Sequence, residues 1–285
     1  MGNCAERERY VSEVAGQREL SSCFAIRLCV LGRPRSSPRP RFRVPRRCAP
    51  RRVIVMLAAA AVCPCPPLLV PEVAVGAAGE VAELRGACLA AVGELAGVDL
   101  VVVVGTGERA GVWTEGGAGS LRRYGVSKAV RLPLGGVDGP ELSPALTVGA
   151  WLLEEAGVRV PTHAVAVRPD TGVERLLGLG RGLAELADRV GLLVLGDGSA
   201  RRSVKAPGYL DERAEGYDRA VALALAGADA SALAGLDAGL SAELMAEGRA
   251  PWQVLAGAAE GAALSGELRY EDAPYGVGYL VASWR

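Results

Sequence analysis

The sequence predicts a single α/β domain in which a mostly parallel core sheet carries helices on both faces. Short apolar runs rich in β-branched residues alternate with longer segments of helical periodicity, which is typical of parallel strands joined by crossover helices. Half of the 285 residues are hydrophobic and only 5% are aromatic, so Ala, Val and Leu must fill the core. Residues 56–285 show neither an internal repeat nor a linker, which favours one domain.

The elements of the first half follow from hydrophobic periodicity and from the placement of glycine and proline. Ser143 and Pro144 predict the start of a helix, because serine caps helices and proline suits the first turn. In chain order we expect a strand at Val53–Val62, a helix at residues 78–96, a strand at Val98–Val104, a glycine-rich loop at residues 105–120, a short strand within residues 121–134 and a helix from Ser143 to Glu155.

The second half repeats the alternation of strand and helix. Asp211 is expected to cap a helix whose buried face holds Tyr217 and Val221. Alanine-rich helices then follow to about Leu264. The remaining expected elements are a strand at His163–Val167, a helix at residues 173–189, a strand at Gly191–Leu195 and closing strands at Glu267–Tyr270 and Val277–Ser283.

The N-terminal segment differs in composition from the rest of the chain. Residues 1–55 hold thirteen arginines and four acidic residues, a net charge of +9, so the remainder carries −9 because the whole chain is formally neutral. Residues 1–52 are predicted to be a basic, Arg/Pro-rich disordered extension, since they cannot bury enough apolar surface to fold. The extension is a nucleic-acid- or membrane-binding tail, a targeting segment, or sequence upstream of a true start at Met56. We therefore divide the chain at 1–52 and 53–285.

Charge, hydropathy and cysteine usage limit the partners and the compartment. The acidic domain does not favour nucleic-acid binding, and no apolar run approaches the ~18–20 residues of a membrane-spanning helix. We therefore expect neither nucleic acid nor a membrane as a partner of the domain. The seven cysteines have the spacing of neither a disulfide framework nor a zinc site, so a reducing cytoplasm is the expected compartment.

The stretch Cys63-Pro64-Cys65-Pro66-Pro67 ends the first strand with a stiff proline turn. The carboxyl ends of parallel strands are where α/β enzymes place ligand-binding side chains. Cys65 is therefore a candidate metal ligand or nucleophile. The alternative is a structural thiol, because free cysteine is among the most buried residue types.

The run Met56–Glu72, which contains Pro64-Cys65-Pro66-Pro67, resembles the start of the catalytic-subunit family of class III extradiol ring-cleavage dioxygenases. The resemblance implies the α/β fold of that family and Fe(II)-dependent cleavage of catechol-type substrates, with iron held by two histidines and a carboxylate. In the family the first histidine stands where this chain has Cys65. The second stands near Thr106, and the acid/base histidine stands where this chain has Ala200.

Further blocks extend the resemblance and its implied site. The stretches Gly196–Asp211, Arg249–Gly257 and Asp272–Leu280 resemble a subfamily of these dioxygenase-like proteins whose activity is uncharacterised. The family's carboxylate ligand corresponds to Glu243 or Glu247, so Cys65 and Glu247 are the metal-ligand candidates. The cofactor implied is Fe(II), and a chain without bound metal is the alternative. His163, the one histidine of the chain, is interpreted as a packed or surface imidazole rather than a ligand.

The polar segment Gly196–Asp211 follows a core strand, so it is expected at the carboxyl-end crevice of the sheet. We predict that it forms a pocket for an anionic or phenolic ligand, with Asp197 and Ser199 as catalytic candidates. A solvated loop is the alternative. The candidate substrate-binding residues are Arg201, Arg202, Lys205 and Tyr209.

Two further stretches carry weaker patterns. Tyr275 is a catalytic candidate that would line the pocket, and the alternative is an edge strand at Asp272–Leu280. Gly105-x-Gly107-x-x-Ala110 nearly matches the dinucleotide fingerprint, which requires a helix N-terminus directly after it. The glycine-rich residues that follow do not predict a helix, so nucleotide binding is not expected.

Three functional hypotheses follow. The first is an extradiol-dioxygenase-like protein whose iron site is lost or rebuilt and whose crevice, near Cys65, Asp197 and Tyr275, binds a small polar or aromatic molecule. The second is a non-catalytic ligand-binding or interaction protein on the same fold, whose alanine- and leucine-rich helices could mediate homo-oligomer formation. The third is a metal-dependent hydrolase that uses Cys65 and nearby carboxylates.

Overall fold

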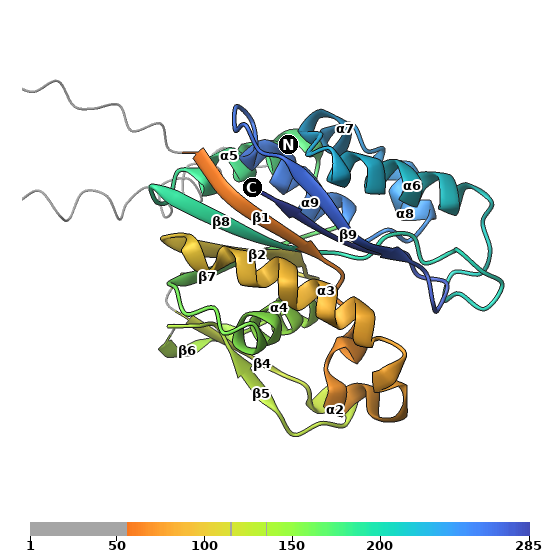
Figure 1. The fold of residues 1–285 in the computed structure, drawn as a ribbon, viewed down its shortest axis with the longest axis horizontal. Helices are drawn as coiled ribbons and strands as arrows, with labels where there is room; N and C mark the ends of the chain where they lie inside the picture. The colour runs from red at the N-terminus through yellow and green to blue at the C-terminus, as the bar shows by residue number, and fades with distance from the viewer. Residues whose placement is uncertain (1–55, 115, 135) are drawn as a thin grey trace, which may run out of the picture. The chain divides into compact units, whose positions relative to one another are not determined.

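The computed structural model describes residues 56–114, 116–134 and 136–285 (Figure 1). The expected extension at residues 1–52 and the expected first residues of the first strand, 53–55, lie outside the described residues. The strands are β1 (Met56–Cys63), β2 (Leu100–Thr106), β3 (Gly111–Trp113), β4 (Gly116–Ser120), β5 (Ala129–Arg131), β6 (Gly136–Glu141), β7 (Thr162–Val167), β8 (Arg189–Leu195), β9 (Gly266–Asp272) and β10 (Tyr279–Trp284). The α-helices are α2 (Pro71–Ala74), α3 (Ala82–Gly93), α4 (Pro144–Glu155), α5 (Val173–Ala184), α6 (Arg213–Ala226), α7 (Ala230–Ala234), α8 (Ala238–Glu243) and α9 (Arg249–Ala258).

Seven strands form the central sheet, in the order β3-β7-β2-β8-β1-β10-β9. The inner pairs β7–β2, β2–β8 and β8–β1 are parallel, whereas β3 at one edge and β10 and β9 at the other pair antiparallel. Helices α3, α4 and α5 connect the parallel strands, as crossover connections require. The predicted fold class, α/β with a mostly parallel sheet, is confirmed.

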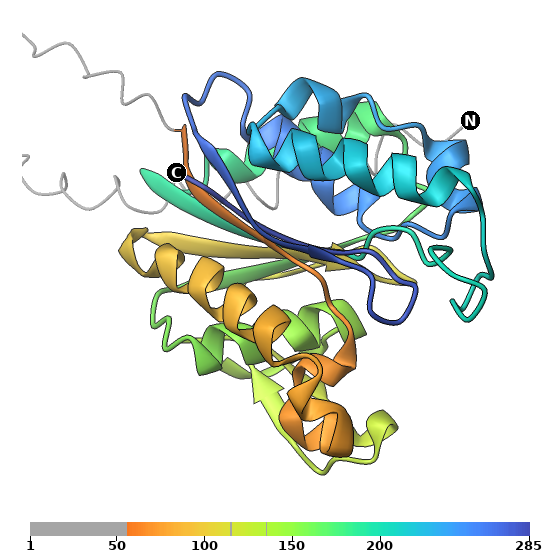
Figure 2. The same cartoon turned by 45° about the vertical axis from the view of Figure 1, so that its right-hand side comes forward.

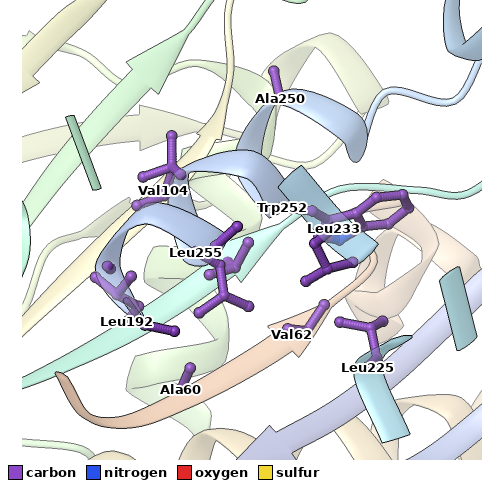
Figure 3. Packing of buried hydrophobic residues seen from close by; sticks show 14 of the residues in the cluster. Ala60, Val62, Val104, Leu192, Leu225, Leu233, Ala250, Trp252 and Leu255 are labelled. Carbon is purple, nitrogen blue, oxygen red and sulfur yellow. The ribbon is translucent and has the colours of Figure 1, made fainter. Parts of the chain in front are cut away.

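Both faces of the sheet are buried, and neighbouring residues of the inner strands point to opposite faces. Val104 lies in a cluster with side chains of α5, α6 and α9, among them Trp252 and Leu255 (Figure 3). Val103 lies in a second cluster with side chains of α3 and α4. Figure 2 shows these two groups of helices on opposite sides of the sheet, which confirms the prediction of helices on both faces.

The expected glycine-rich loop at residues 105–120 is wrong. These residues contain β3, which pairs with β7, and β4, which joins β5 and β6 in a second, three-stranded sheet. Strand β4 lies so close to α4 that a Cβ on Gly119 would stand 2.1 Å from the Thr147 hydroxyl oxygen. Glycine therefore serves close packing here rather than a flexible loop.

Several boundaries also differ from the expected ones. Helix α3 is shorter than expected because 3-10 turns at Val75–Gly79 and Glu94–Gly97 flank it. Helix α5 ends at Ala184, since β8 already begins at Arg189. The prediction that Asp211 caps the next helix is wrong by one residue: the N-cap of α6 is Glu212, and Asp211, just ahead of it, accepts the backbone N–H of Arg213 at 3.0 Å. In the part of the chain that the structure describes, no helix is both long and apolar enough to cross a membrane.

Candidate functional site

The carboxyl ends of β2, β8 and β1 lie side by side, because these strands are parallel neighbours in the sheet. The chain leaving β8 stays against β1, since the Gly196 N–H donates to the Cys63 carbonyl at 3.1 Å. The residues that follow these strands therefore meet at one edge, where open α/β sheets bind ligands. Thr106, Cys65 and Asp197 lie at this edge, so the sequence-predicted position of Cys65 and Asp197 holds.

Cys65 and Asp197 are in direct contact through the main chain. The Cys65 backbone N–H donates to Asp197 Oδ1 at 2.8 Å. In Pro64-Cys65-Pro66-Pro67 only Cys65 has a backbone N–H, because proline has none. The single main-chain donor of the proline turn is therefore directed at the carboxyl group of Asp197.

Glu247 joins this pair from the connection between α8 and α9. The Gly248 N–H donates to the Asp197 carbonyl at 2.8 Å, and a Cβ on Gly196 would lie 2.3 Å from the Gly248 Cα. This backbone contact places Glu247 beside Asp197. The Thr106 hydroxyl donates to Glu247 Oε2 over a long 3.5 Å. Glu247 is exposed, whereas Asp197 and Cys65 are half-buried, so solvent reaches all three.

The surroundings raise the pKa values of both Asp197 and Cys65. Burial raises the pKa of Asp197 to about 7, with a further rise from Glu247 and an opposing effect of the Cys65 N–H. Burial, followed by the charges of Asp197 and Glu247, raises the pKa of the Cys65 thiol well above its ordinary value. Cys65 therefore stays a thiol at neutral pH, whereas Asp197 is poised to exchange a proton.

Tyr279 is a residue of this site that the sequence did not indicate. It begins β10, next to β1, and it is buried. Burial raises the pKa of its phenol, and the charges of Asp197 and then Cys65 raise it further. Thr106 lies near the position that the resemblance gives to the second histidine, but no role was predicted for it, because a threonine at the end of an apolar strand carries no distinctive pattern.

The donor set does not fit the iron site that the family resemblance implies. That site needs two histidines, and this chain has one. His163 sits near the start of β7, opposite Val102, whereas the crevice lies at the other end of these strands, where Thr106 pairs with Val167. Burial lowers the pKa of His163, and its Nδ1 has no hydrogen-bond partner among the described residues. What the crevice offers is one thiol, held protonated, and two carboxylates.

Within residues 56–114, 116–134 and 136–285, no group of three or more His, Cys, Asp or Glu side chains is arranged to hold a metal ion. Cys65 and Glu247, the metal-ligand candidates that the resemblance implies, nevertheless lie at one edge of the sheet, where the charge of Glu247 acts on Cys65.

Ser199 and Arg202 follow Asp197 closely in sequence, but their side chains are engaged elsewhere. Ser199 is fully buried; its hydroxyl donates to the Leu244 carbonyl at 3.2 Å and accepts from the Arg201 N–H at 3.1 Å. Arg202 pairs with Asp218 of α6 at 3.1 Å. These contacts hold the segment in place, and the structure does not bring either side chain to the Cys65–Asp197 contact.

The remaining candidate substrate-binding residues lie further along the same segment. Hydrogen bonds from Arg213 lower the pKa of Asp211 to about 2, and the charge of Arg201, which is half-buried, makes a smaller contribution. Lys205 is exposed, and Tyr209 is 64% exposed. The charged neighbour that acts on Asp197 is instead the acid Glu247.

Tyr275 lies in the turn between β9 and β10. Its ring packs against the same cluster of side chains as Cys65. Its hydroxyl donates to Glu80 Oε2 at 2.8 Å, which ties the hairpin to the segment ahead of α3. Tyr275 thus lies in a turn rather than within an edge strand, and its hydroxyl group is engaged by Glu80.

No family model and no curated protein matches the chain. A search of solved structures found the crystal structure of the uncharacterized protein JW3007 from Escherichia coli K12, at 16% sequence identity and a TM-score of 0.48. The alignment covers 80% of this chain and 99% of that one.

Proposed function

We propose that this chain is an extradiol-dioxygenase-like protein that binds a small polar or aromatic molecule at the carboxyl ends of β1, β2 and β8. In this proposal Asp197 exchanges a proton with the bound molecule. The observation that carries it is the half-buried carboxyl group of Asp197, held by the Cys65 N–H beside Glu247. The resemblance of Met56–Glu72 to the family supports it from the sequence.

The chemistry available in this crevice is proton transfer. A carboxyl group with a pKa near the working pH is present in both forms, so it can donate a proton to a ligand oxygen and take one back. Glu247 adds negative charge beside Asp197 at the solvent side, and the Thr106 hydroxyl donates to Glu247. Tyr279 is also near, since the charge of Asp197 raises the pKa of its phenol. Fe(II) is implied by the family resemblance alone, and the donor set of this crevice does not fit it, because the chain has one histidine.

A chromophoric catechol tests the proposal. We expect purified wild type to bind 4-nitrocatechol, followed by the change in its absorbance when the hydroxyl group changes ionisation. Asp197→Asn should weaken binding about tenfold or more, equivalent to about 1.4 kcal/mol. Glu260→Gln is the matched control, since this exposed carboxylate pairs with Arg181 away from the crevice. The proposal fails if wild type does not bind the probe or if Asp197→Asn binds it equally well.

Iron is tested in the same preparations. After anaerobic loading with Fe(II), elemental analysis should find less than one iron per chain. One iron per chain, lost on Cys65→Ala, would show that a rebuilt metal site exists and would contradict the finding that the donor set of this crevice does not fit iron.

A second candidate function is interaction with another protein or with a second copy of this chain. The observation that favours it is a set of exposed apolar side chains on and near the Gly196–Asp211 segment: Val204, Tyr209, Leu210 and Met245. Light scattering of wild type and Tyr209→Ser distinguishes this function from ligand binding in the crevice. A mass above the monomer that falls in the variant, together with no binding of 4-nitrocatechol, would favour interaction.

A further inference from the structure

The carboxylate of Asp218, on α6, lies at the centre of the contacts that hold the turn after β8. It is 1% exposed. Its Oδ1 accepts the Ser199 N–H at 2.7 Å, and its Oδ2 accepts from Arg202 Nη1 at 3.1 Å. Both oxygens are thus engaged by donors from the segment that carries Asp197.

Two glycines leave the space that this carboxylate occupies. A Cβ on Gly198 would lie 2.7 Å from Asp218 Oδ1, and a Cβ on Gly278 would lie 2.3 Å from Asp218 Oδ2. Any side chain at either position would overlap the carboxylate. Residues that are far apart in the sequence, in the Asp197 turn and in the hairpin before β10, are therefore shaped around one buried acid.

The same glycines tie the turn to the sheet. The Gly198 N–H donates to the Gly278 carbonyl at 2.7 Å, and the Gly278 N–H donates to the Ser199 carbonyl at 2.8 Å. Asp197 lies between this bridge and Gly196, which is bonded to β1. Both neighbours of Asp197 are thus fixed, Gly196 by Cys63 of β1 and Gly198 by Gly278. Asp218 holds the next residue, Ser199, and so keeps this turn where the Asp197 carboxyl group meets the Cys65 N–H.

We propose that Asp218, paired with Arg202, is the positioning residue that holds Asp197 against the Cys65 amide. The inference rests on the proposed function for its purpose but not for its geometry. Removal of the Asp218 carboxylate would release the Ser199 N–H and the Arg202 side chain together. The turn would then loosen, and the Cys65 N–H would lose its acceptor.

Hydrogen exchange of the Cys65 amide in the full chain reads this contact directly. We expect Asp218→Ala to speed exchange at Cys65 about tenfold or more relative to core amides such as Val62, because local opening is reported amide by amide. Asp218→Asn should have a smaller effect, since it keeps an acceptor for Ser199 but loses the charge that pairs with Arg202. Arg202→Gln should resemble Asp218→Asn.

Arg219→Gln is the control, because Arg219 is the next residue on α6 and pairs with Glu271 at the surface. It should leave the Cys65 amide unchanged. If Asp218→Ala does not fold, Asp218→Asn and Arg202→Gln decide the outcome. Exchange at Cys65 that changes only in step with Val62, in variants that are folded, would overturn the positioning role. Failure of wild type to bind 4-nitrocatechol would instead overturn the proposed function and leave this test intact.

Discussion

The two halves of the segment Gly196–Asp211 look alike in sequence and behave differently in the structure. In the first half, Gly196, Gly198 and Ser199 are buried and bonded to β1, to Asp218 or to the hairpin before β10. In the second half, from Val204 to Leu210, most side chains are exposed. Polarity alone does not distinguish them. What distinguishes them is whether a buried partner from another element reaches the segment.

The pairing of the arginines also helps to explain the pKa of Asp197 in the crevice, which burial raises first and Glu247 raises further. Two arginines of this region pair with acids outside the crevice, Arg202 with Asp218 and Arg213 with Asp211 and Glu243. Asp197 is left with an acidic neighbour, Glu247, and its pKa rises. The segment is thus rich in cations, while the carboxyl group that it carries is surrounded by apolar and acidic groups.

The largest expected effect is at the buried bridge. Gly278→Ala would place a methyl group onto the Asp218 carboxylate, so we expect a loss of about 3 kcal/mol in the free energy of unfolding. Urea denaturation measures it. Gly216→Ala is the control on α6, because a Cβ there meets nothing within 4 Å and alanine favours a helix interior. Equal urea midpoints for Gly278→Ala and wild type would show that the bridge is not rigid.

A medium effect is expected from the ionisation of Asp197. Its pKa is about 7 in the folded chain, against an ordinary value of 3.8, so the folded state holds the proton more tightly than the unfolded state. The contribution of Asp197 to stability is therefore constant below about pH 4, falls as the pH rises toward 7, and is constant again above. Asp197→Asn removes this decrease in stability with pH, because the asparagine side chain does not ionise.

Urea unfolding of wild type and Asp197→Asn at several pH values between 4 and 8 measures the difference. The stability of the variant relative to wild type should rise by about 2 kcal/mol across this range, roughly half of what the full pKa shift corresponds to, because solvent screens the half-buried carboxyl group. A difference that stays constant with pH would mean that Asp197 titrates near its ordinary value. Burial, the paired arginines and the acidic neighbour Glu247 would then not set the charge state of Asp197.

The smallest effect is expected in the exposed half. Tyr209 has a φ of 61°, in the left-handed region that costs a residue with a side chain about 1 kcal/mol. Because the ring is 64% exposed, Tyr209→Gly gives up little packing. We expect thermal unfolding to show unchanged or slightly raised stability, by up to about 1 kcal/mol. A loss larger than that would show that this half is also held by buried contacts.

The sequence was sufficient for the parts of the molecule that depend on local pattern. Apolar runs such as Val98–Val104 and the Ser143-Pro144 start of α4 predicted strands and helices, and strand ends predicted that Cys65 and Asp197 share one edge. It was insufficient where the partner is remote. Nothing near Ser199 indicates that Asp218 and the Leu244 carbonyl will bury it. The glycines of β4 suggested a loop because the helix they pack against, α4, follows only later in the chain.

The proline turn after β1 separates the anchor of Asp197 from the side chain at position 65. The group that anchors Asp197 is the amide of residue 65 and not its sulfur. Any amino acid except proline supplies that amide, so a change of side chain at position 65 leaves the anchor in place. The side chain at this point of the crevice can therefore be exchanged while the carboxyl group opposite keeps its place.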